Sequence, residues 1–322
     1  MNKIFLVLFA AVAFQANADP VWIEQNNLVG DIGGWRAYAK ERAVPGPLTP
    51  NVNFTLPQAI DRAWRNQLDW TNYLPGSESI SNYSILSSAQ RSALQQRYAI
   101  AYETTKAYYE LVLLKEKLTY MENVLDAVAA ASELTNRMFK VGNTNQLNQL
   151  KQQNELYKKQ LEFKALQTKY EETRERFLQR MNFDASDTQF EVDRRLPNPP
   201  NFSRQLTDRE RKAIDFGTIN NPASVQVRSN ARIAHQAYLN LHQAALKYKN
   251  EILPNQKKIS EEKLLRYNAM LIDVFHLLED AEDQSKAVIQ YIDSNAALVI
   301  QSARLEKALI DAQMDFSNIN AR

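Results

Sequence analysis

"FKVGNTNQL", Phe139 to Leu147, decides the fold, because it holds the only glycine between Gly76 and Gly217. The residues on either side, from about position 84 to 181, contain no proline and are rich in helix formers. One glycine followed by small polar residues predicts the end of one helix and the start of another. We therefore expect two long antiparallel helices joined by "GNTN". Gly142 would be the left-handed residue, and Thr144 or Asn145 the cap of the second helix.

Apolar residues before this turn recur at alternating steps of three and four, which is typical of a helix packed lengthwise on another. They are Leu111, Leu114, Leu118, Met121, Leu125 and Val128. An unbroken helix over 88–141 would be about 80 Å long, at about 1.5 Å per residue. After the turn a weaker seam continues through Leu147, Leu150, Tyr157 and Leu161.

A second helical zone begins at Asn221 and contains no glycine and only two prolines, Pro222 and Pro254. Pro254 should kink or interrupt a helix because it lacks an N–H and clashes with the preceding turn. We expect helices over 231–253, 255–267 and 271–312. "RYNAMLIDVFHLL" in this zone aligns with "RMFKVGNTNQLNQL" in the first, at an offset of roughly 130 residues. That offset is too long for a solenoid and indicates a duplicated helical hairpin.

Composition narrows the classes of function. The chain of 322 residues has no Cys, 7 Gly, 24% charged residues and a net charge of +2. Disulfides are excluded, and the balanced charge argues against nucleic-acid binding. No nucleophile–base pair, phosphate loop or carboxylate dyad is present, so we predict no enzyme and no cofactor.

The first residues, "MNKIFLVLFAAVAFQANADP", are typical of a secretory signal that is cleaved after Ala18. No later segment is apolar enough for a transmembrane helix. We divide the chain into a signal peptide (1–18), an extended arm with one short helix (19–83), a first helical hairpin (84–183), a Pro-rich linker (184–220) and a second hairpin (221–322). The short helix is "TLPQAIDRAWRNQL", capped by Thr55.

Several stretches, in order, resemble the TolC family of outer-membrane efflux proteins, in particular the branch whose second turn reads RYNGM. They are "FTLPQAIDRAWRNQL", "TTKAYYELVLLKEKLTYMENVLDAVAAASELTNRMFKVGNTNQLNQLKQQNELY", "FEVDRRLPNPP", "INNPASVQVRSNARIA" and "EILPNQKKISEEKLLRYNAMLIDVFHLLEDAEDQ". The resemblance implies a homotrimer that forms a helical tunnel across the periplasm and docks by its helical tips onto an adapter protein and an inner-membrane pump.

One part of the family pattern is missing. The two places where each family member contributes strands to a membrane β-barrel, residues 68–88 and 234–238, are too short here for strands of about 9–11 residues with turns. We therefore predict an all-α protein of duplicated long hairpins, a TolC-like α-barrel protomer without a transmembrane β-barrel. We expect it in the periplasm, associated with the outer membrane or extracellular, and without a membrane span of its own.

By the same resemblance, the two turns carry the docking residues. In the first they are Arg137, Gly142, Asn143 and Thr144, and in the second Arg266, Tyr267, Asn268, Ala269 and Met270. The alternative is that both are plain helix connections. Ala269 stands where the branch has glycine, so either the second turn is tighter or Asn268 is its left-handed residue.

Asp273 is the sharpest single candidate, since the resemblance implies a ring of Asp273 side chains that constricts the tunnel. The alternative is an ordinary Asp at a helix start. An acidic run beside it is either a solvated face or part of the tunnel lining: Glu279, Asp280, Glu282 and Asp283. His235, His242 and His276 are residues of a type that can bind a metal ion. The first two are two turns apart, too far to share an ion without another ligand, so we predict no metal site.

The leading functional prediction is a conduit component of an efflux or export system. The alternative is a structural protein that assembles into a helical tube or filament without transport, favoured by apolar residues near Trp70, Tyr73, Leu74 and Ile85. A metal-binding periplasmic protein is disfavoured by the few His and Met and the absent Cys.

Overall fold

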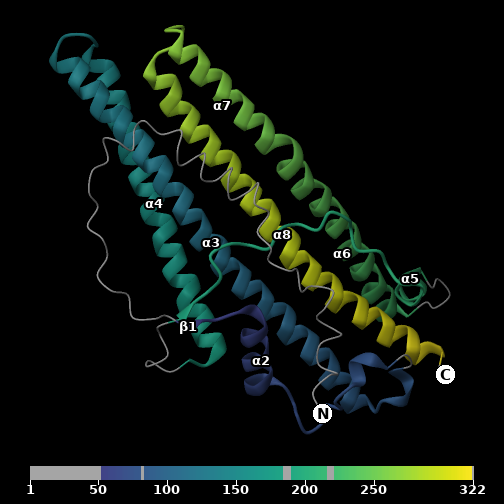
Figure 1. Cartoon of the computed structure of the whole chain (residues 1–322). Helices are drawn as coiled ribbons and strands as arrows, with labels where there is room; N and C mark the ends of the chain where they lie inside the picture. Colours follow the sequence, from purple (N-terminus) through teal and green to yellow (C-terminus); the bar gives the residue numbers. More distant parts are fainter. Residues whose placement is uncertain (1–51, 81–82, 184–189, 216–220, 321–322) are drawn as a thin grey trace.

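The computed structural model describes residues 52–80, 83–183, 190–215 and 221–320 (Figure 1). The predicted signal peptide and most of the predicted arm lie outside these residues. The described part is built almost entirely of helices, with one parallel pair of two-residue strands, β1 (Val52–Asn53) and β2 (Phe190–Glu191). The predicted all-α fold is confirmed.

The first hairpin consists of α3 (Ser88–Lys140) and α4 (Gln146–Met181). Ser87 starts α3 with a capping box, in which its side chain accepts from the Gln90 backbone N–H and Gln90 reaches back to the Ser87 N–H. The helix then runs for 53 residues without a break, as the sequence predicts.

The second hairpin consists of α6 (Pro222–Lys247), the π-helix η5 (Tyr248–Ile252), α7 (Leu253–Asn268) and α8 (Val274–Asn320). The predicted interruption at Pro254 takes the form of this π turn. Its wider turn relieves the clash between the Pro254 ring and the carbonyl of the preceding turn, so the helix continues in the same direction. The last helix begins later than predicted, at Val274, and extends beyond the predicted end at residue 312.

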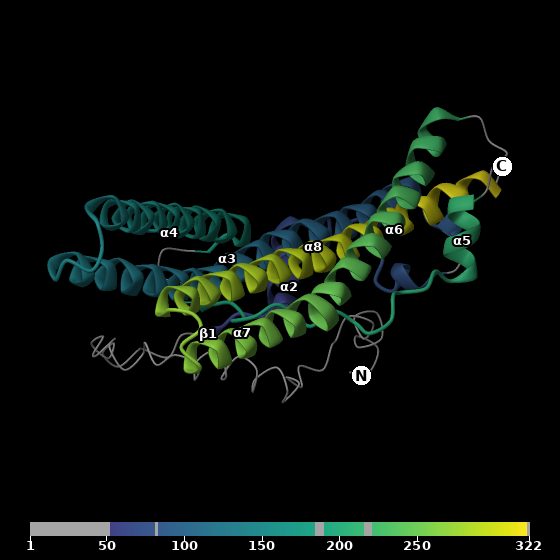
Figure 2. The same cartoon turned by 90° about the horizontal axis from the view of Figure 1, so that it is seen from above.

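The long helices lie side by side in a single layer, in the order α4, α3, α8 and then α6 with α7 (Figures 1 and 2). Helix α4 packs along α3, and α7 packs along α8. The turns of both hairpins therefore lie at the same end of the molecule, which we call the tip end. α2 (Leu56–Gln67) and α5 (Asp208–Asp215) lie nearer the other end.

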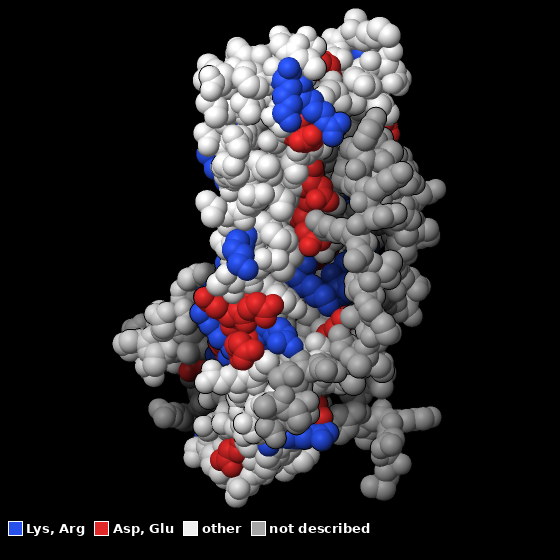
Figure 3. Space-filling model, turned by 90° about the vertical axis from the view of Figure 1, so that its left-hand side faces the viewer, with Lys and Arg blue, Asp and Glu red and all other residues white. Residues whose placement is uncertain are grey.

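The face that α4 turns to α3 differs from the predicted one. Leu156, Phe163 and Leu166 pack against Met121, Val124 and Val128 of α3. The four predicted seam residues of α4 are exposed instead: Leu147 by 60%, Leu150 by 47%, Tyr157 by 50% and Leu161 by 71%. We call these four residues the α4 stripe. Figure 3 views this side of the molecule, where uncharged surface lies between clusters of charged residues of both signs.

An aromatic cluster fixes the base of the first hairpin. Phe54, between β1 and α2, makes edge contacts with Phe177, Phe183 and Phe190, at centroid distances of 6.2, 5.3 and 6.0 Å. Because Phe177 and Phe183 lie at the C-terminal end of α4 and Phe190 lies in β2, the cluster joins α2 to the hairpin. The predicted cap Thr55 starts α2 in a capping box with Gln58.

After β2, residues 193–204 cross the helix layer, and we call this segment the strap. It is held by side chains of α3, α8 and α6. The contacts are Tyr108 Oη to Asp193 Oδ2 (2.7 Å), Leu196 N to Glu116 Oε2 (3.1 Å), Asn295 Nδ2 to Pro197 O (2.8 Å), His242 Nε2 with Pro200 O (2.8 Å) and Arg204 N to Tyr238 Oη (3.1 Å). The strap thus ties the two hairpins together across their shared layer.

Glu116 is the unusual member of these anchors, because its side chain is buried within the α3–α8 contact. Burial raises the pKa of its carboxyl to about 7, although the Leu196 N–H and the charge of Arg195 act in the opposite direction. The folded chain therefore holds a proton here that the unfolded chain loses at lower pH.

We expect the free energy of unfolding to fall as the pH rises from about 4.5 to about 7, because the unfolded state loses this proton first. Glu116→Gln should remove that fall and be more stable than wild type above about pH 7.5, by about 1–3 kcal/mol. Urea unfolding at a series of pH values measures this. Glu122→Gln, on the exposed face of α3, serves as the control and should follow wild type. A Glu116→Gln profile parallel to that of wild type would contradict the prediction.

Candidate functional site at the helical tips

The first tip is formed by residues 141–145, between α3 and α4. Gly142 has a φ of 78° and donates its N–H to Phe139 O (3.0 Å), while Asn143 donates to Met138 O (2.8 Å). These two bonds define a Schellman motif, in which the left-handed residue satisfies the last carbonyls of the helix. Asn145 then caps α4 by accepting from Asn148 N (2.9 Å). The predicted left-handed Gly142 is confirmed, and Asn145 rather than Thr144 is the cap.

The second tip is formed by residues 269–273, between α7 and α8, and repeats this turn. Met270 donates its N–H to Tyr267 O (2.9 Å), and Leu271 donates to Arg266 O (2.9 Å). The left-handed residue is Met270, with a φ of 58°. The prediction that Asn268 would take this conformation is wrong.

The reason is that α7 does not end before Asn268. Asn268 is the last residue of α7, and Ala269 follows with a φ of −83°, which any residue adopts. Ala269 therefore corresponds to Val141, and the position equivalent to Gly142 is Met270. An alignment that pairs Arg137 with Arg266 is off by one residue at the turn. The identical turns support the interpretation of the chain as two repeats, which stays a prediction.

Asp273 caps α8. Its Oδ1 accepts from the backbone N–H of Phe275 (3.0 Å) and of His276 (3.3 Å), and lies 2.8 Å from His276 Nδ1. Slight desolvation raises the pKa of the Asp273 carboxyl, but the hydrogen bonds and the nearby His276 outweigh it and hold the pKa below its ordinary value. The side chain remains 62% exposed. The ordinary helix-start role is therefore present, and it leaves Oδ2 free to face solvent or another chain.

The other predicted docking residues lie on the surface of the tips. Arg137 pairs with Glu133 (2.7 Å) and Arg266 with Glu262 (3.0 Å), each one turn earlier on its own helix. Large apolar side chains surround them: Phe139, Val141 and Leu147 at the first tip, and Leu265, Tyr267, Met270 and Leu271 at the second. Both tips thus present apolar groups with exposed cations beside them.

The acidic run on α8 is only partly a solvated face. Glu279 and Asp283 are exposed, but Asp280 is buried, lies 3.1 Å from Lys263 of α7 and accepts from Gln284 (2.8 Å). The ion pair with Lys263 holds α7 on α8. The four residues do not share one face, because a helix turns about 100° per residue. Asp280 therefore points toward α7.

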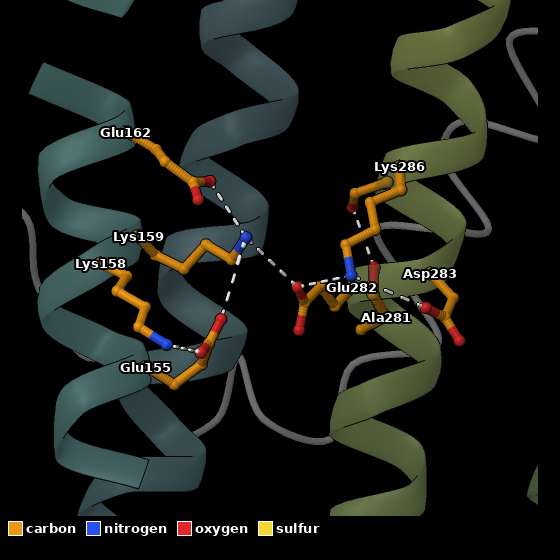
Figure 4. Close-up of polar contacts among 9 residues, drawn as sticks. Glu155, Lys158, Lys159, Glu162, Ala281, Glu282, Asp283 and Lys286 are labelled. Atoms are coloured by element: carbon orange, nitrogen blue, oxygen red, sulfur yellow. Dashed lines mark hydrogen bonds and ion pairs between the residues drawn. The ribbon is translucent and has the colours of Figure 1, made fainter. Parts of the chain in front are cut away.

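Glu282 forms the second internal contact of this run, and Figure 4 shows its carboxylate pointing from α8 toward Lys159 on α4. It lies 3.6 Å from Lys159 of α4 and 2.8 Å from Lys286. Burial lowers the pKa of Lys159, but its hydrogen bond to Glu162 and the charges of Glu162, Glu282 and Glu155 outweigh this and raise it. The Lys159–Glu282 pair therefore links α4 directly to α8.

The three histidines occupy separate places. His242 is buried against the strap, and His276 lies at the second tip. Burial, followed by the charge of Arg204, lowers the pKa of His235. Among the described residues, no three His, Asp or Glu side chains lie close enough together to hold a metal ion.

Sequence reasoning missed three features: the buried Glu116, the Lys159–Glu282 pair and the left-handed Met270. Glu116 follows Tyr108 and Val112 at one-turn spacing, so a carboxylate on an apolar face was a usable signal. Nothing in the sequence places Lys159 opposite Glu282, because the two lie on different hairpins.

No helix in the described ranges combines the length and apolar character that would cross a membrane. No protein-family model matches the chain, and no curated protein resembles it in sequence. Solved structures do match its fold.

The chain is similar to the CmeC outer membrane channel of Campylobacter jejuni, with a TM-score of 0.57 and 11% identity over 72% of this chain and 68% of that one. It is also similar to the outer-membrane channel OprN, with a TM-score of 0.52 and 11% identity over 70% and 69% of the two chains. A membrane protein from Pseudomonas aeruginosa matches with a TM-score of 0.51 and 11% identity over 69% and 70%. At this identity the likeness concerns the fold, and the predicted TolC-like fold is confirmed.

The equivalent turns give a matched set of variants. Gly142→Ala should lower the free energy of unfolding by about 1 kcal/mol, because a side chain disfavours the left-handed conformation although space is open around it. Met270→Gly should raise it by about 0.5–1 kcal/mol, since relief of the left-handed conformation exceeds the added freedom of the unfolded chain.

Ala269→Gly, the residue of the RYNGM pattern, is the control and should lower the free energy of unfolding by about 0.5–1 kcal/mol, because its φ needs no glycine. Urea unfolding at a fixed protein concentration measures all three variants. A stabilising Ala269→Gly together with a destabilising Met270→Gly would contradict the assignment of the left-handed residue.

A double-mutant cycle with Lys159→Met and Glu282→Gln tests the link between α4 and α8. Both side chains are mostly shielded from solvent, by contrast with the exposed Glu155–Lys158 pair on the surface of α4. We expect a coupling energy of about 0.5–1 kcal/mol for the first pair and close to zero for Glu155→Gln with Lys158→Met. Equal coupling in the two cycles would remove any special role for Lys159.

Proposed function

We propose that the chain is a TolC-type conduit protein of the RYNGM branch, exported to the periplasm after cleavage behind Ala18, that forms part of an efflux or export system. The observation that carries this proposal is the single layer of long helices shared with two outer membrane channels. A layer of this kind encloses a passage only when several copies close on themselves. In this role the chain forms the wall of the passage and the constriction at its end, and it catalyses no reaction.

Copies of the layer can close into a ring only if their edges fit each other. Both edges of the layer carry exposed apolar residues. The α4 stripe lies along one edge. On the other, Val225 and Ile233 of α6 and Ile259 of α7 are exposed by 47, 57 and 47%. Burial of apolar surface drives such contacts, at about 25 cal/mol per Å². We propose that the α4 stripe of one copy packs on α6 and α7 of the next to give a homotrimer.

In this assembly the two tips of every copy point to one end, where they would dock on a periplasmic adapter protein and, through it, an inner-membrane pump. Their exposed apolar residues, with Arg137 and Arg266 beside them, fit a protein surface with apolar and acidic groups. Asp273 would face the threefold axis at this end. Its low pKa keeps it charged, so a ring of three would favour cations and repel itself.

A second candidate is a structural tube or filament protein without transport. Trp70, Leu74 and Ile85 are exposed by 52, 40 and 71% at the end opposite the tips. Apolar residues at that end favour end-to-end stacking of tubes. The two candidates differ in whether assembly stops at a closed ring.

Light scattering and electron microscopy of the purified mature chain, residues 19–322, distinguish them. We expect closed trimers with one narrow end, at which the Asp273 carboxylates face the axis. Filaments would favour the structural candidate, and monomers at about 100 µM would contradict both.

The double substitution Leu150→Glu with Leu161→Glu should shift trimers to monomers, because it places charges in the buried interface. Leu271→Glu is the matched control: the residue is as exposed as Leu161 but lies at the tip, so the trimer should persist. Loss of trimers in both variants would contradict the proposed edge contact. Sequencing of the exported protein's N-terminus checks the cleavage behind Ala18.

A further inference from the structure

The second tip contains a side chain that its backbone disfavours. Met270 is left-handed, with a φ of 58°, a conformation that is rare for residues other than Gly, Asn, Asp and His. Its side chain is 92% exposed. Neither packing nor backbone geometry accounts for a methionine here, because glycine forms the same turn at Gly142. An outlier of this kind points to a use for the side chain.

The other methionines of the described residues are less exposed than Met270, and three of them are buried. Met121, Met181 and Met314 are exposed by 9, 0 and 2%, and Met138 is intermediate. A water-borne oxidant therefore meets one thioether before the rest. Met270 lies among Leu265, Tyr267 and Leu271, which are themselves exposed, so it belongs to an apolar surface rather than to an isolated spot.

We propose that Met270 is a reversible oxidation site whose sulfoxide changes the second tip from an apolar to a polar surface. Hydrogen peroxide transfers one oxygen atom to the thioether sulfur, which loses two electrons, and the second oxygen leaves as water after taking up the proton of the first. The product is methionine sulfoxide, which a sulfoxide reductase returns to methionine.

Oxidation leaves the turn intact. The bonds that hold the tip are made by the backbone N–H groups of Met270 and Leu271 and by the Asp273 carboxylate, and none involves the sulfur. The sulfoxide adds a strong hydrogen-bond acceptor at the most exposed of the large apolar residues of the tip. The modification thus alters what the tip can bind without unfolding the hairpin. That it would weaken docking on an adapter rests on the proposed function, whereas the oxidation itself does not.

Peptide mapping of the full mature chain after timed exposure to hydrogen peroxide tests the site. Trypsin places every described methionine in a different peptide, and Met270 alone falls in 267–286. We expect the gain of one oxygen in this peptide to be at least about tenfold faster than in those of Met181 and Met314. Equal rates in the three peptides, or a slower rate at Met270, would overturn the proposal.

Two variants test the change in surface. Met270→Leu keeps an apolar side chain that peroxide does not oxidise, and Met270→Gln resembles the sulfoxide; both keep a side chain at the left-handed position. On a hydrophobic-interaction column, oxidised wild type and Met270→Gln should elute earlier than reduced wild type. A sulfoxide reductase should return oxidised wild type to the elution volume of the reduced protein. Met270→Leu should not shift after peroxide. An equal shift in Met270→Leu would overturn the proposal, whereas a failure of the reduced chain to form trimers would count only against the proposed function.

Discussion

The rest of the structure depends on the lengthwise antiparallel contact between α3 and α8. Three apolar clusters hold it along its length: one with Leu94 and Met314 near the base, one with Tyr108 and Val299 in the middle, and one with Tyr120, Tyr291 and Ile292 toward the tips. Lys117 adds an ion pair to Asp293 (2.8 Å) at the edge of this contact. Since one of these helices comes from each hairpin, their contact joins the two halves of the chain, and the strap fastens the same junction through Glu116 and Asn295.

A single layer built on this contact leaves the outer helices with one long neighbour each. Helix α4 covers α3 with one face and presents the α4 stripe to solvent with another. In a compact protein a second layer would cover that stripe. Among the described residues, the ion pair between Lys159 and Glu282 links α4 to α8 across α3. The layer thus leaves apolar surface uncovered along the edge formed by α4.

Much of this fold could be predicted from the sequence. Gly142 among helix formers gives the first hairpin, Pro254 marks the irregular turn, and the ordered resemblance gives the TolC-like architecture. The face of α4 could not be predicted, because this helix carries two apolar stripes, and the sequence does not tell which one meets α3. Contacts between hairpins, such as Lys159 with Glu282, depend on a register that local patterns do not contain.

The candidate site was predictable in position but not in detail. The RYNGM pattern has glycine at the position of Ala269, so the left-handed residue was expected beside it, at Asn268. The geometry places Met270 there instead. Because both turns have the same backbone, the difference between Gly142 and Met270 is not imposed by folding. The first tip offers backbone and small polar groups such as Asn143 at its apex, and the second offers a flexible thioether. A partner that contacts both tips of a copy therefore meets similar apolar surroundings but a different residue at the left-handed position of each turn.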